Sequence, residues 1–350
     1  MLARGATVGA IRAQKWIVVE TPRTSLEDVA SLAGVSAASA SRALTGRGEL
    51  SPETRRRVLE AAATLGYDRS STPRGRPRPP DARIIELVFG RLTGAWVSRA
   101  VVGAHEQAFA LGYDLVLTQE RESASDDWHV RAAARHSSGV ITAVVTPTAG
   151  QIDYLAEFAI PTVLLDPHGE PHRDLVTVSA TNERGGFEAG RHLVERGYER
   201  FALALSPLQY RYGRARTRGF REALAAAGVD DLATVEVGWD GRISRAAVDR
   251  LVGLAEGGPV GLFALNDTMA NAVVSALLRA GVRVPEDVGV VGFDGDPRPP
   301  SAPLAVTSIH QPIREMAARA IDAVDRLRRG EQIAQRRIEL PTDLLRRDST

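Results

Sequence analysis

Residues 25–67 read SLEDVASLAGVSAASASRALTGRGELSPETRRRVLEAAATLGY and predict three short amphipathic helices joined by tight turns. The first helix has apolar residues at the spacing of one helical face: Leu26, Val29, Ala30 and Ala33. Gly34 is placed to end that helix in a left-handed conformation, and Ser36 can cap a second helix over 37–44. Pro52 opens the third, because proline at the first helical position loses no needed N–H. This arrangement is typical of a helix-turn-helix DNA reader.

The second helix of such a unit lies in the major groove, where its N-terminal residues meet base edges. We expect DNA contacts from its start and outward face: Ser36, Ala37, Ala38, Ser39, Ser41 and Arg42. Arg42 can bind a guanine through two hydrogen bonds or bind a phosphate, and serine hydroxyls suit phosphates or either base. Ala37 and Ala38 offer only apolar contact, for example to a thymine methyl. The alternatives are that these alanines merely form helix, or that the unit is a small bundle without a DNA role.

The same segment resembles the headpiece of the lac repressor (LacI/GalR) family, and the likeness continues through most of the chain. The resemblance implies a ligand-controlled, DNA-binding transcription regulator. Repression with sugar-induced release is the commoner behaviour in that family. The positions of Ala37 and Ala38 are those at which its members vary to change operator preference.

The charge is divided unevenly along the chain. Residues 1–80 contain thirteen Lys or Arg and seven Asp or Glu, so they carry about +6. The whole chain carries +1, so residues 81–350 carry about −5. A basic head gains affinity for phosphates by releasing counterions, and an acidic body keeps the rest of the protein off the DNA.

Composition excludes several classes of protein. The 350 residues contain no cysteine, which removes disulfides, zinc ribbons and thiol catalysis. No apolar run reaches the length of a signal peptide or a membrane span, since Arg12 and Lys15 interrupt the N-terminal stretch. His168 and His172 are four residues apart, but the glycine and proline between them indicate a loop rather than a metal site. With no phosphate-binding loop and no nucleophilic-serine elbow, we expect a cytoplasmic protein without metal, cofactor or catalytic residues.

A linker dense in Pro, Gly, Ser and Arg, DRSSTPRGRPRPPDAR, occupies residues 68–83 and favours an extended connection. Relatives in the lac repressor family usually carry a Pro-Asn pair here, then a short helix whose leucine wedges into the minor groove. This chain departs from that pattern: Arg69-Ser70 replaces the pair, Arg76 falls near the leucine, and neighbouring prolines disfavour a helix. We expect Arg69, Arg74 and Arg76 to approach a narrow minor groove by shape and charge, with less bending of the DNA or a different coupling to ligand.

Beyond the linker, short apolar runs alternate with longer amphipathic stretches, which predicts an α/β core of repeated βαβ units. The expected strands are Ile84–Phe89, Leu115–Thr118, Val140–Val145, Thr162–Leu165, Val176–Val178, Phe201–Leu205, Thr234–Val237, Val260–Ala264 and Val288–Phe293. The expected helices include Ser98–Leu111, Asn182–Arg196, Arg214–Ala227, Asp267–Ala280 and Pro312–Arg329.

The resemblance implies that this core forms two parallel-sheet lobes, like a periplasmic sugar-binding protein, with the chain crossing between them three times. We expect crossings near Ala180, Ser308 and Leu340. The expected parts of the chain are an N-terminal tail (1–23), an all-α helix-turn-helix headpiece (24–67), the hinge linker (68–83) and a two-lobed ligand-binding and dimerisation core (84–346).

The cleft between the lobes is the expected ligand site, because loops at the C-terminal ends of parallel strands bind ligands. Residues that follow strand ends or match the family's ligand contacts are Trp96, Arg216, Trp239, Asn266, Asp267 and Asp294. An aromatic face packs on a sugar ring or stacks on a base, and an arginine fork suits two hydroxyls or a carboxylate. Trp96 has an alternative role as a core or dimer-interface residue, and Asp267 as a helix cap. For Arg216 and Asp294 the alternative is an interlobe salt bridge or a cap.

These side chains favour a neutral polyhydroxylated ligand. The stretch IIELVFGRLTGAW, residues 84–96, also resembles a subgroup that answers to plant-wall oligosaccharides. A purine or nucleoside is the rival ligand, since aromatic rings and carboxylates serve bases as well. A sugar-binding protein without DNA function and an α/β enzyme are the remaining alternatives. We expect a homodimer on a near-palindromic DNA operator, with the helix over 312–329 and the neighbouring first-lobe surface in the dimer contact.

Overall fold

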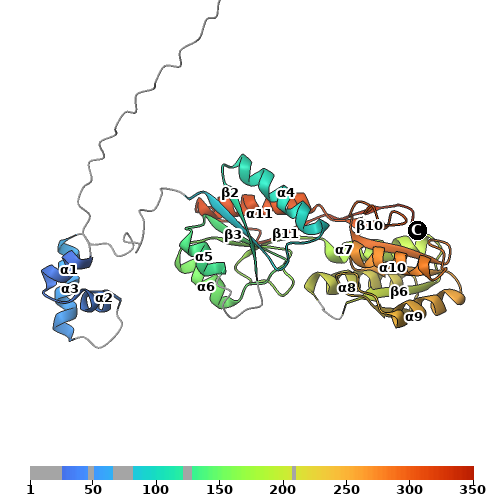
Figure 1. Cartoon of the computed structure of the whole chain (residues 1–350), viewed down its shortest axis with the longest axis horizontal. Coiled ribbons are helices and arrows are strands. Elements are labelled where there is room, and N and C mark those ends of the chain that lie inside the picture. The colour runs from blue at the N-terminus through green and yellow to red at the C-terminus, as the bar shows by residue number, and fades with distance from the viewer. Residues whose placement is uncertain (1–25, 46–50, 66–81, 121–127, 207–209) are drawn as a thin grey trace, which may run out of the picture. The chain divides into compact units, whose positions relative to one another are not determined.

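The computed structural model describes residues 26–45, 51–65, 82–120, 128–206 and 210–350 (Figure 1). The chain divides into two compact units, residues 1–79 and 80–350. The expected N-terminal tail and the hinge arginines Arg69, Arg74 and Arg76 lie outside the described residues. Within the described residues, no helix has both the length and the apolar character needed to cross a membrane.

The described part of the first unit is a three-helix headpiece: α1 (Leu26–Ala33), α2 (Ala37–Thr45) and α3 (Pro52–Thr64). Its core is made of small apolar side chains: Val29, Ala30, Ala33, Ala40, Ala43, Val58, Ala61 and Ala62. Gly34 adopts a φ of +64°, which lets the chain reverse after α1 while the Val35 N–H donates to the Ala30 carbonyl at 3.0 Å. Ala40 and Ala43 form the buried face of α2.

The second unit begins with a lobe built on a parallel sheet of strand order β11-β5-β4-β3-β1-β2. Its strands are β1 (Ile84–Phe89), β2 (Asp114–Gln119), β3 (Gly139–Ala143), β4 (Thr162–Leu165), β5 (Val176–Ala180) and β11 (Arg337–Leu340). Its helices are α4 (Ala95–Ala110), α5 (Trp128–Ala134), α6 (Ala149–Glu157) and α11 (Ile313–Arg328). Side chains alternate along each strand, so Ile85 and Leu87 of β1 face the core under α4 and α11, whereas Val88 faces the core under α5 and α6.

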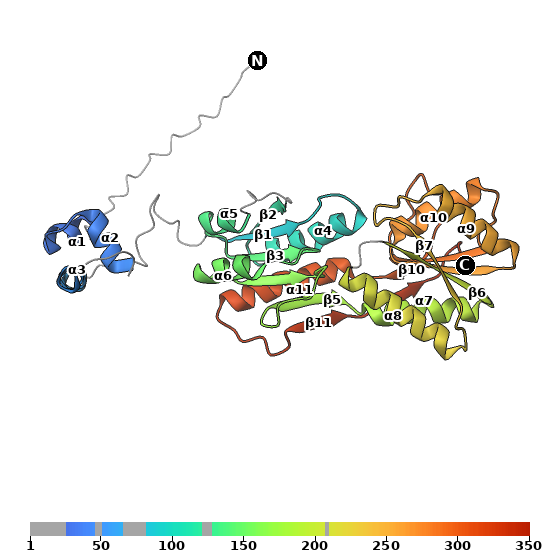
Figure 2. The same ribbon diagram turned by 90° about the horizontal axis from the view of Figure 1, so that it is seen from below.

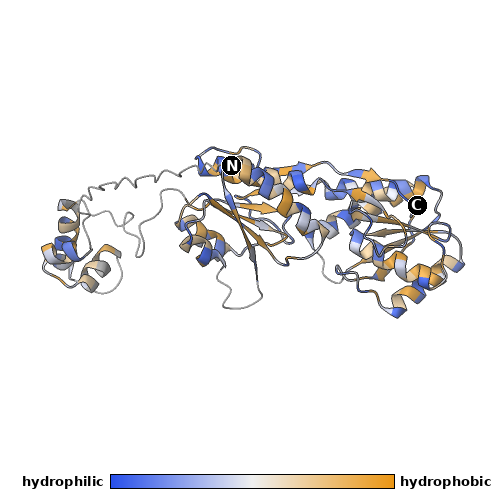
Figure 3. Ribbon diagram, turned by 45° about the horizontal axis from the view of Figure 1, so that its top comes forward, coloured by the Kyte–Doolittle hydropathy of each residue, from blue (hydrophilic) through white to orange (hydrophobic). Residues whose placement is uncertain are grey.

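The second lobe has a sheet of strand order β12-β10-β9-β8-β6-β7, parallel except for β12. Its strands are β6 (Arg200–Leu205), β7 (Leu232–Glu236), β8 (Val260–Ala264), β9 (Val288–Asp294), β10 (Thr307–His310) and β12 (Asp343–Leu345). Figure 2 shows α9 (Arg245–Glu256) and α10 (Asp267–Arg279) on one side of this sheet, with α7 (Asn182–Glu195) and α8 (Arg211–Ala226) on the other. Apolar residues concentrate on the strands inside both lobes (Figure 3).

Helices α7 and α8 pack at very short range because glycines lie at their crossing. A Cβ placed on Gly186 would lie 2.0 Å from the Arg216 carbonyl oxygen, and one on Gly219 would lie 1.8 Å from the Glu183 carbonyl oxygen. Only glycine permits this approach of two backbones. The contact therefore places Arg216 of α8 beside Asn182, the first residue of α7.

The chain passes between the lobes three times, as expected: between β5 and α7, between β10 and α11, and between β11 and β12. Thr181 in the first crossing and Thr342 in the third are joined through their hydroxyls at 3.1 Å. All nine predicted strands are present. The edge strand β11, the edge strand β12 and the neighbouring β10 were not predicted, because each has only three or four residues and weak apolar character.

Candidate functional sites

The start of α2 is the candidate DNA-contacting element of the headpiece. The Ser36 hydroxyl accepts a hydrogen bond from the Ser39 backbone N–H at 3.2 Å, so Ser36 caps α2 as predicted. Ser36 is exposed, whereas Ser39 and Ala37 are half-buried. Ala37 packs against the headpiece core, which leaves it less surface for a base than an outward residue has. The side chains of Ala38, Ser41 and Arg42 lie outside the described part of the structure.

Arg216 is the centre of the candidate ligand site in the core. It is only 2% exposed, and its Nε donates to the Asn182 Oδ1 at 2.8 Å while Nη1 donates to the Leu265 carbonyl at 2.6 Å. Nη1 also lies 3.6 Å from Asp294 Oδ1, and the guanidinium lies over the Phe293 ring at 3.7 Å from its centroid. These contacts hold the arginine fork in one orientation. Both partners of the Asp294–Arg216 pair lie in the second lobe, so the pair does not bridge the lobes.

Asp294 ends β9 with a φ of +111° and is 8% exposed. Its Oδ1 accepts a hydrogen bond from the Gln311 amide at 2.5 Å. Burial raises the pKa of Asp294 to about 7; Arg216 opposes this rise and Asp296 adds to it. The carboxyl group therefore changes its charge near neutral pH.

Three aromatic side chains form one side of the site. Trp239 follows β7 and is half-buried; its ring centroid lies 5.4 Å from that of Tyr210 and 5.3 Å from that of Tyr212. Tyr212 in turn lies under the Arg216 guanidinium, at 5.2 Å. Because each ring contacts its neighbour, the cluster presents an aromatic surface next to the arginine fork.

Asn266 and Asp267 have different roles. Asn266 is the N-cap of α10: its Oδ1 accepts from the Met269 N–H at 2.7 Å, and its Nδ2 donates to the Trp239 carbonyl at 3.3 Å. The capping role considered for Asp267 thus belongs to Asn266. Asp267 is 1% exposed, and its Oδ2 accepts from the Asp296 N–H at 2.6 Å, which fixes the loop behind Asp294. Burial and the nearby Asp294 charge raise the pKa of Asp267 well above its usual range.

Trp96 lies in the first turn of α4, where it is half-buried and packs against the first-lobe core. One helical turn further, Arg99 reaches the second lobe: its Nη2 donates to the Asp294 carbonyl at 3.0 Å and pairs with Asp296 Oδ1 at 2.5 Å. The first helix of the first lobe therefore contacts the loop that carries Asp294 through Arg99, a residue that the sequence did not single out.

A polar cavity of about 460 Å³ opens where the lobes meet beside this cluster. Its walls are Thr181, Asn182, Glu183 and Arg184 at the start of α7, Arg211, Arg214, Ala215 and Arg218 of α8, and Glu170, Ala180 and Glu339 of the first lobe. Asn182 lines the cavity and also accepts from Arg216, so the cavity adjoins the buried arginine.

Comparisons with known proteins agree with both halves of the molecule. Residues 25–70 match the family described as bacterial regulatory proteins, lacI family, and residues 191–350 match a periplasmic binding protein-like domain. The HTH-type transcriptional regulator CelR of Thermobifida fusca is 31% identical over 346 residues, which covers 93% of this chain and 98% of CelR. This chain belongs to the lacI family.

Two further relatives extend the likeness over nearly the whole length. The HTH-type transcriptional repressor PurR of Photobacterium profundum is 27% identical over 335 residues, with 93% of this chain and 98% of PurR covered. A solved transcriptional regulator CelR–cellobiose complex superposes with a TM-score of 0.68 at 29% identity, covering 94% of this chain and all of that one. The expected fold class, a helix-turn-helix headpiece plus a two-lobed α/β core, is confirmed, and this lacI-family chain is a ligand-responsive DNA-binding regulator.

Two residues of this lacI-family protein were not predicted to lie in the cleft: Asp166 was not singled out, and His168 was considered only as a metal ligand. Asp166 follows β4 in the first lobe with a φ of +46° and is 2% exposed. Burial raises the pKa of Asp166. The charges of Arg216 and Arg211 and a hydrogen bond with Asn182 act in the opposite direction and lower it. His168 faces the second lobe, where its ring centroid lies 5.6 Å from that of Tyr210 and its carbonyl accepts from the Arg211 N–H at 2.7 Å. The position of Asp166 after a buried strand was the available signal.

Proposed function

We propose that this chain is a repressor that leaves its operator when a neutral, polyhydroxylated ligand of the sugar or oligosaccharide class occupies the cleft. It acts by binding alone, without catalysis. The observation that carries the proposal is the buried Arg216, whose fork is held by Asn182 and Asp294 beside the rings of Tyr212 and Trp239.

The charges around Arg216 support a neutral ligand. Asp294 lies 3.6 Å from the guanidinium, and Asp166 is buried within its electrostatic reach from the other lobe. Two carboxyl groups close to one arginine disfavour an anionic ligand, because it would be desolvated beside them. Hydroxyl groups can both donate to carboxylates and accept from a guanidinium, and sugar C–H faces pack on aromatic rings. The CelR of the solved complex binds cellobiose, which is a ligand of this class.

For the DNA half, we propose that Ser36, Ala37, Ala38, Ser39, Ser41 and Arg42 of α2 and its cap meet the major groove. The hinge residues Arg69, Arg74 and Arg76 are proposed to approach the minor groove. Prolines in that segment disfavour a helix, so we propose that it does not insert a leucine wedge at the operator centre. A co-crystal with operator that showed a kink at a leucine wedge would contradict this part of the proposal.

Two headpieces on a near-palindrome require a homodimer. The helix expected to contribute to the dimer contact, α11, has sixteen residues, and eight of them are buried inside the first lobe. Exposed apolar side chains lie on α4 and β2: Val102 is 42% exposed, Phe109 78% and Leu117 44%. Because large exposed apolar side chains gathered on neighbouring elements mark interaction surfaces, we propose that α4 and β2 form the first-lobe part of the dimer contact.

Helix α4 also offers a route for coupling the two sites. Its Arg99 contacts the loop of Asp294, while its outer face carries Val102 and Phe109. A ligand that favours one arrangement of the lobes would shift α4 and thereby the spacing of the two headpieces. A coupling of about 1–3 kcal/mol would change operator affinity roughly 5–150-fold.

The experiment is fluorescence-anisotropy titration of the full-length protein on labelled palindromes from the DNA upstream of its own gene, with and without a panel of sugars and purines. Salt-sensitive binding to one palindrome, weakened by a sugar such as cellobiose, is the expected result. If only a purine or nucleoside releases the protein from the palindrome, the ligand is of that class and not a sugar. Absence of specific DNA binding would overturn the regulator proposal in favour of a sugar-binding protein without DNA function.

A further inference from the structure

One end of the first lobe is basic although the core as a whole is acidic. We propose that the end of the first lobe at which the linker joins the core, here called the linker-end face, binds the phosphate backbone of DNA beside the operator. The inference rests on the DNA-binding function of the headpiece and adds a second, sequence-independent DNA contact in the core.

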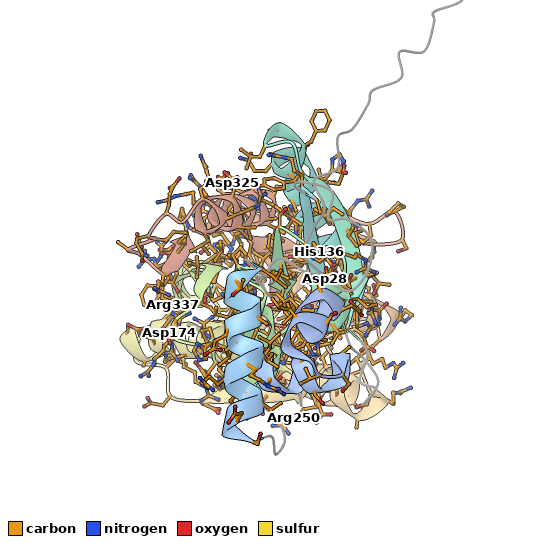
Figure 4. The ribbon with its side chains drawn as sticks, turned by 90° about the vertical axis from the view of Figure 1, so that its left-hand side faces the viewer. Asp28, His136, Asp174, Arg250, Asp325 and Arg337 are labelled. Carbon is orange, nitrogen blue, oxygen red and sulfur yellow. The ribbon has the colours of Figure 1, made fainter. Side chains whose placement is uncertain are left out.

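Strand direction brings the parts of this face together. β1, β2, β3, β4, β5 and β11 run parallel, so the segments that precede them lie at one end of the sheet. Together with the last residues of α5, α6 and α11 and the first residues of β2 and β11, these segments are residues 82–83, 111–114, 134–138, 157–161, 171–175 and 326–337. The linker enters the core at the start of β1, at this same end. Figure 4 views the molecule from that side and labels His136, Asp174 and Arg337.

Positive charge dominates the linker-end face. Its exposed arginines are Arg83, Arg135, Arg173, Arg326, Arg328, Arg329, Arg336 and Arg337. Its exposed carboxylates are Asp114, Glu157, Asp174 and Glu331. The eight arginines and four carboxylates give the face a net charge of +4. Two buried carboxylates also pair with arginines of the face: Glu86 with Arg135, and Asp325 with Arg329. If these two are counted as well, the net charge is +2. Residues 81–350 as a whole carry about −5, so the charge of the core is segregated rather than spread evenly.

Three arginines of this face, Arg173, Arg336 and Arg337, lie on neighbouring segments and are available to phosphates. Arg336 donates to the Asp174 carbonyl, and Arg337 donates to the Thr177 hydroxyl. Neutral oxygen partners hold these side chains in place without cancelling their charge. Arg173 is 92% exposed and lies 3.8 Å from the Asp174 carboxylate, a surface pair that water screens strongly. Arginine forks of this kind match phosphate oxygens.

The linker between headpiece and core indicates that DNA is the partner of this face. Residues 66–81 separate the headpiece from the core and include four arginines and two aspartates. Sixteen residues span at most about 55 Å when fully extended, so DNA bound by the headpiece stays within that reach of the linker-end face. A tethered contact forms at a high effective concentration, so even weak phosphate contacts add to the total affinity. The contacts would carry no base preference, since phosphates are common to all sequences.

The test measures the salt dependence of DNA binding by the full-length protein. Wild type and a triple variant, Arg173→Gln with Arg336→Gln and Arg337→Gln, are titrated by anisotropy against a labelled mixed-sequence duplex of about 60 bp, between about 50 and 200 mM NaCl. Each phosphate contact contributes about 0.9 to the slope of log K against log salt. We expect the slope to fall by about 1–3 in the triple variant.

A matched control variant removes the same number of positive charges from the second lobe: Arg242→Gln with Arg245→Gln and Arg250→Gln, all at exposed positions. We expect its slope to equal that of wild type. The single reversal Arg173→Glu, at a position that is 92% exposed, should lower the slope without affecting folding. A triple-variant slope equal to wild type, or equal losses in triple variant and control, would overturn this inference while the regulator proposal stands. A wild-type protein that does not bind the mixed-sequence duplex would also overturn this inference, whereas the regulator proposal fails only if specific binding to the palindrome is absent.

Discussion

Replacing Gly219 with alanine should separate α7 from α8 and disturb the ligand site from a distance. The added Cβ would lie 1.8 Å from the Glu183 carbonyl oxygen and 2.8 Å from the Phe187 backbone nitrogen. Ordinary contact begins near 3.4 Å, so the two backbones must part by about 1.6 Å. Backbone atoms cannot rotate away as a side chain can, so we expect a loss of about 1–3 kcal/mol in the free energy of unfolding, typical of overpacking.

The same movement should act on the arginine fork. Arg216 precedes Gly219 by one helical turn, and its Nε lies 2.8 Å from Asn182 at the start of α7. A separation of this size would lengthen that bond beyond hydrogen-bonding range. Hydrogen bonds to charged groups contribute about 1.5–3 kcal/mol. We therefore expect the sugar concentration needed for half release of operator to rise about tenfold or more, if the fork clamps the ligand.

The matched control is Gly253→Ala in α9, where an added Cβ meets nothing within 4 Å. Alanine there should stabilise the protein by about 0.5–1 kcal/mol, because it lowers the entropy cost of forming the helix. Thermal unfolding and ligand titration of wild type and both variants make the comparison. Equal stability and equal ligand response in Gly219→Ala and Gly253→Ala would refute the close-packing argument.

Three further predictions concern single side chains. Arg42→Ala should weaken operator binding at least about tenfold while ligand binding, followed by tryptophan fluorescence, is retained, since one good base contact contributes about 1–3 kcal/mol; unchanged operator affinity would mean that α2 has been placed wrongly. Arg216→Ala should bind operator but lose release by ligand, and a normal response would remove Arg216 from the site. Burial raises the pKa of Asp294 to about 7, above its value in the unfolded chain. Between about pH 4 and 7 the folded protein therefore holds a proton that the unfolded chain has lost, so stability should fall as pH rises through this window. In Asp294→Asn the free energy of unfolding, measured by chemical denaturation, should depend less on pH. A pH profile identical to that of wild type would contradict the raised pKa of Asp294.

Much of the architecture was predictable because strands buried on both faces are continuous apolar runs. The segment VGLFA of β8 was predicted with its observed bounds, and it is buried throughout. β11, by contrast, reads RIEL, with Arg337 and Glu339 exposed at the edge of the sheet. Its place beside β5 depends on a pairing with residues about 160 positions earlier, such as Thr177 with Arg337. The local sequence does not indicate which distant strand β11 pairs with.

The candidate ligand site was predictable where a residue follows a strand end, as Trp239 and Asp294 do. The site was not predictable where the role of a residue depends on a contact with the other lobe. Arg99 appears in the sequence as one charged residue on an amphipathic helix, and only the fold brings it to Asp296. The division of roles between Asn266 and Asp267 likewise depends on side-chain direction, which a shared strand-end position does not reveal.

A thermodynamic cycle between operator and ligand shows whether the cleft and the headpieces are coupled. The dissociation constant of the releasing sugar is measured by calorimetry on the free dimer and on the dimer saturated with operator. If one conformational equilibrium links the cleft to the headpieces, operator must weaken sugar binding by the same factor, about 5–150-fold, by which sugar weakens operator binding. Equal sugar affinity for the free and the DNA-bound protein would contradict the account, because the two sites would then be uncoupled.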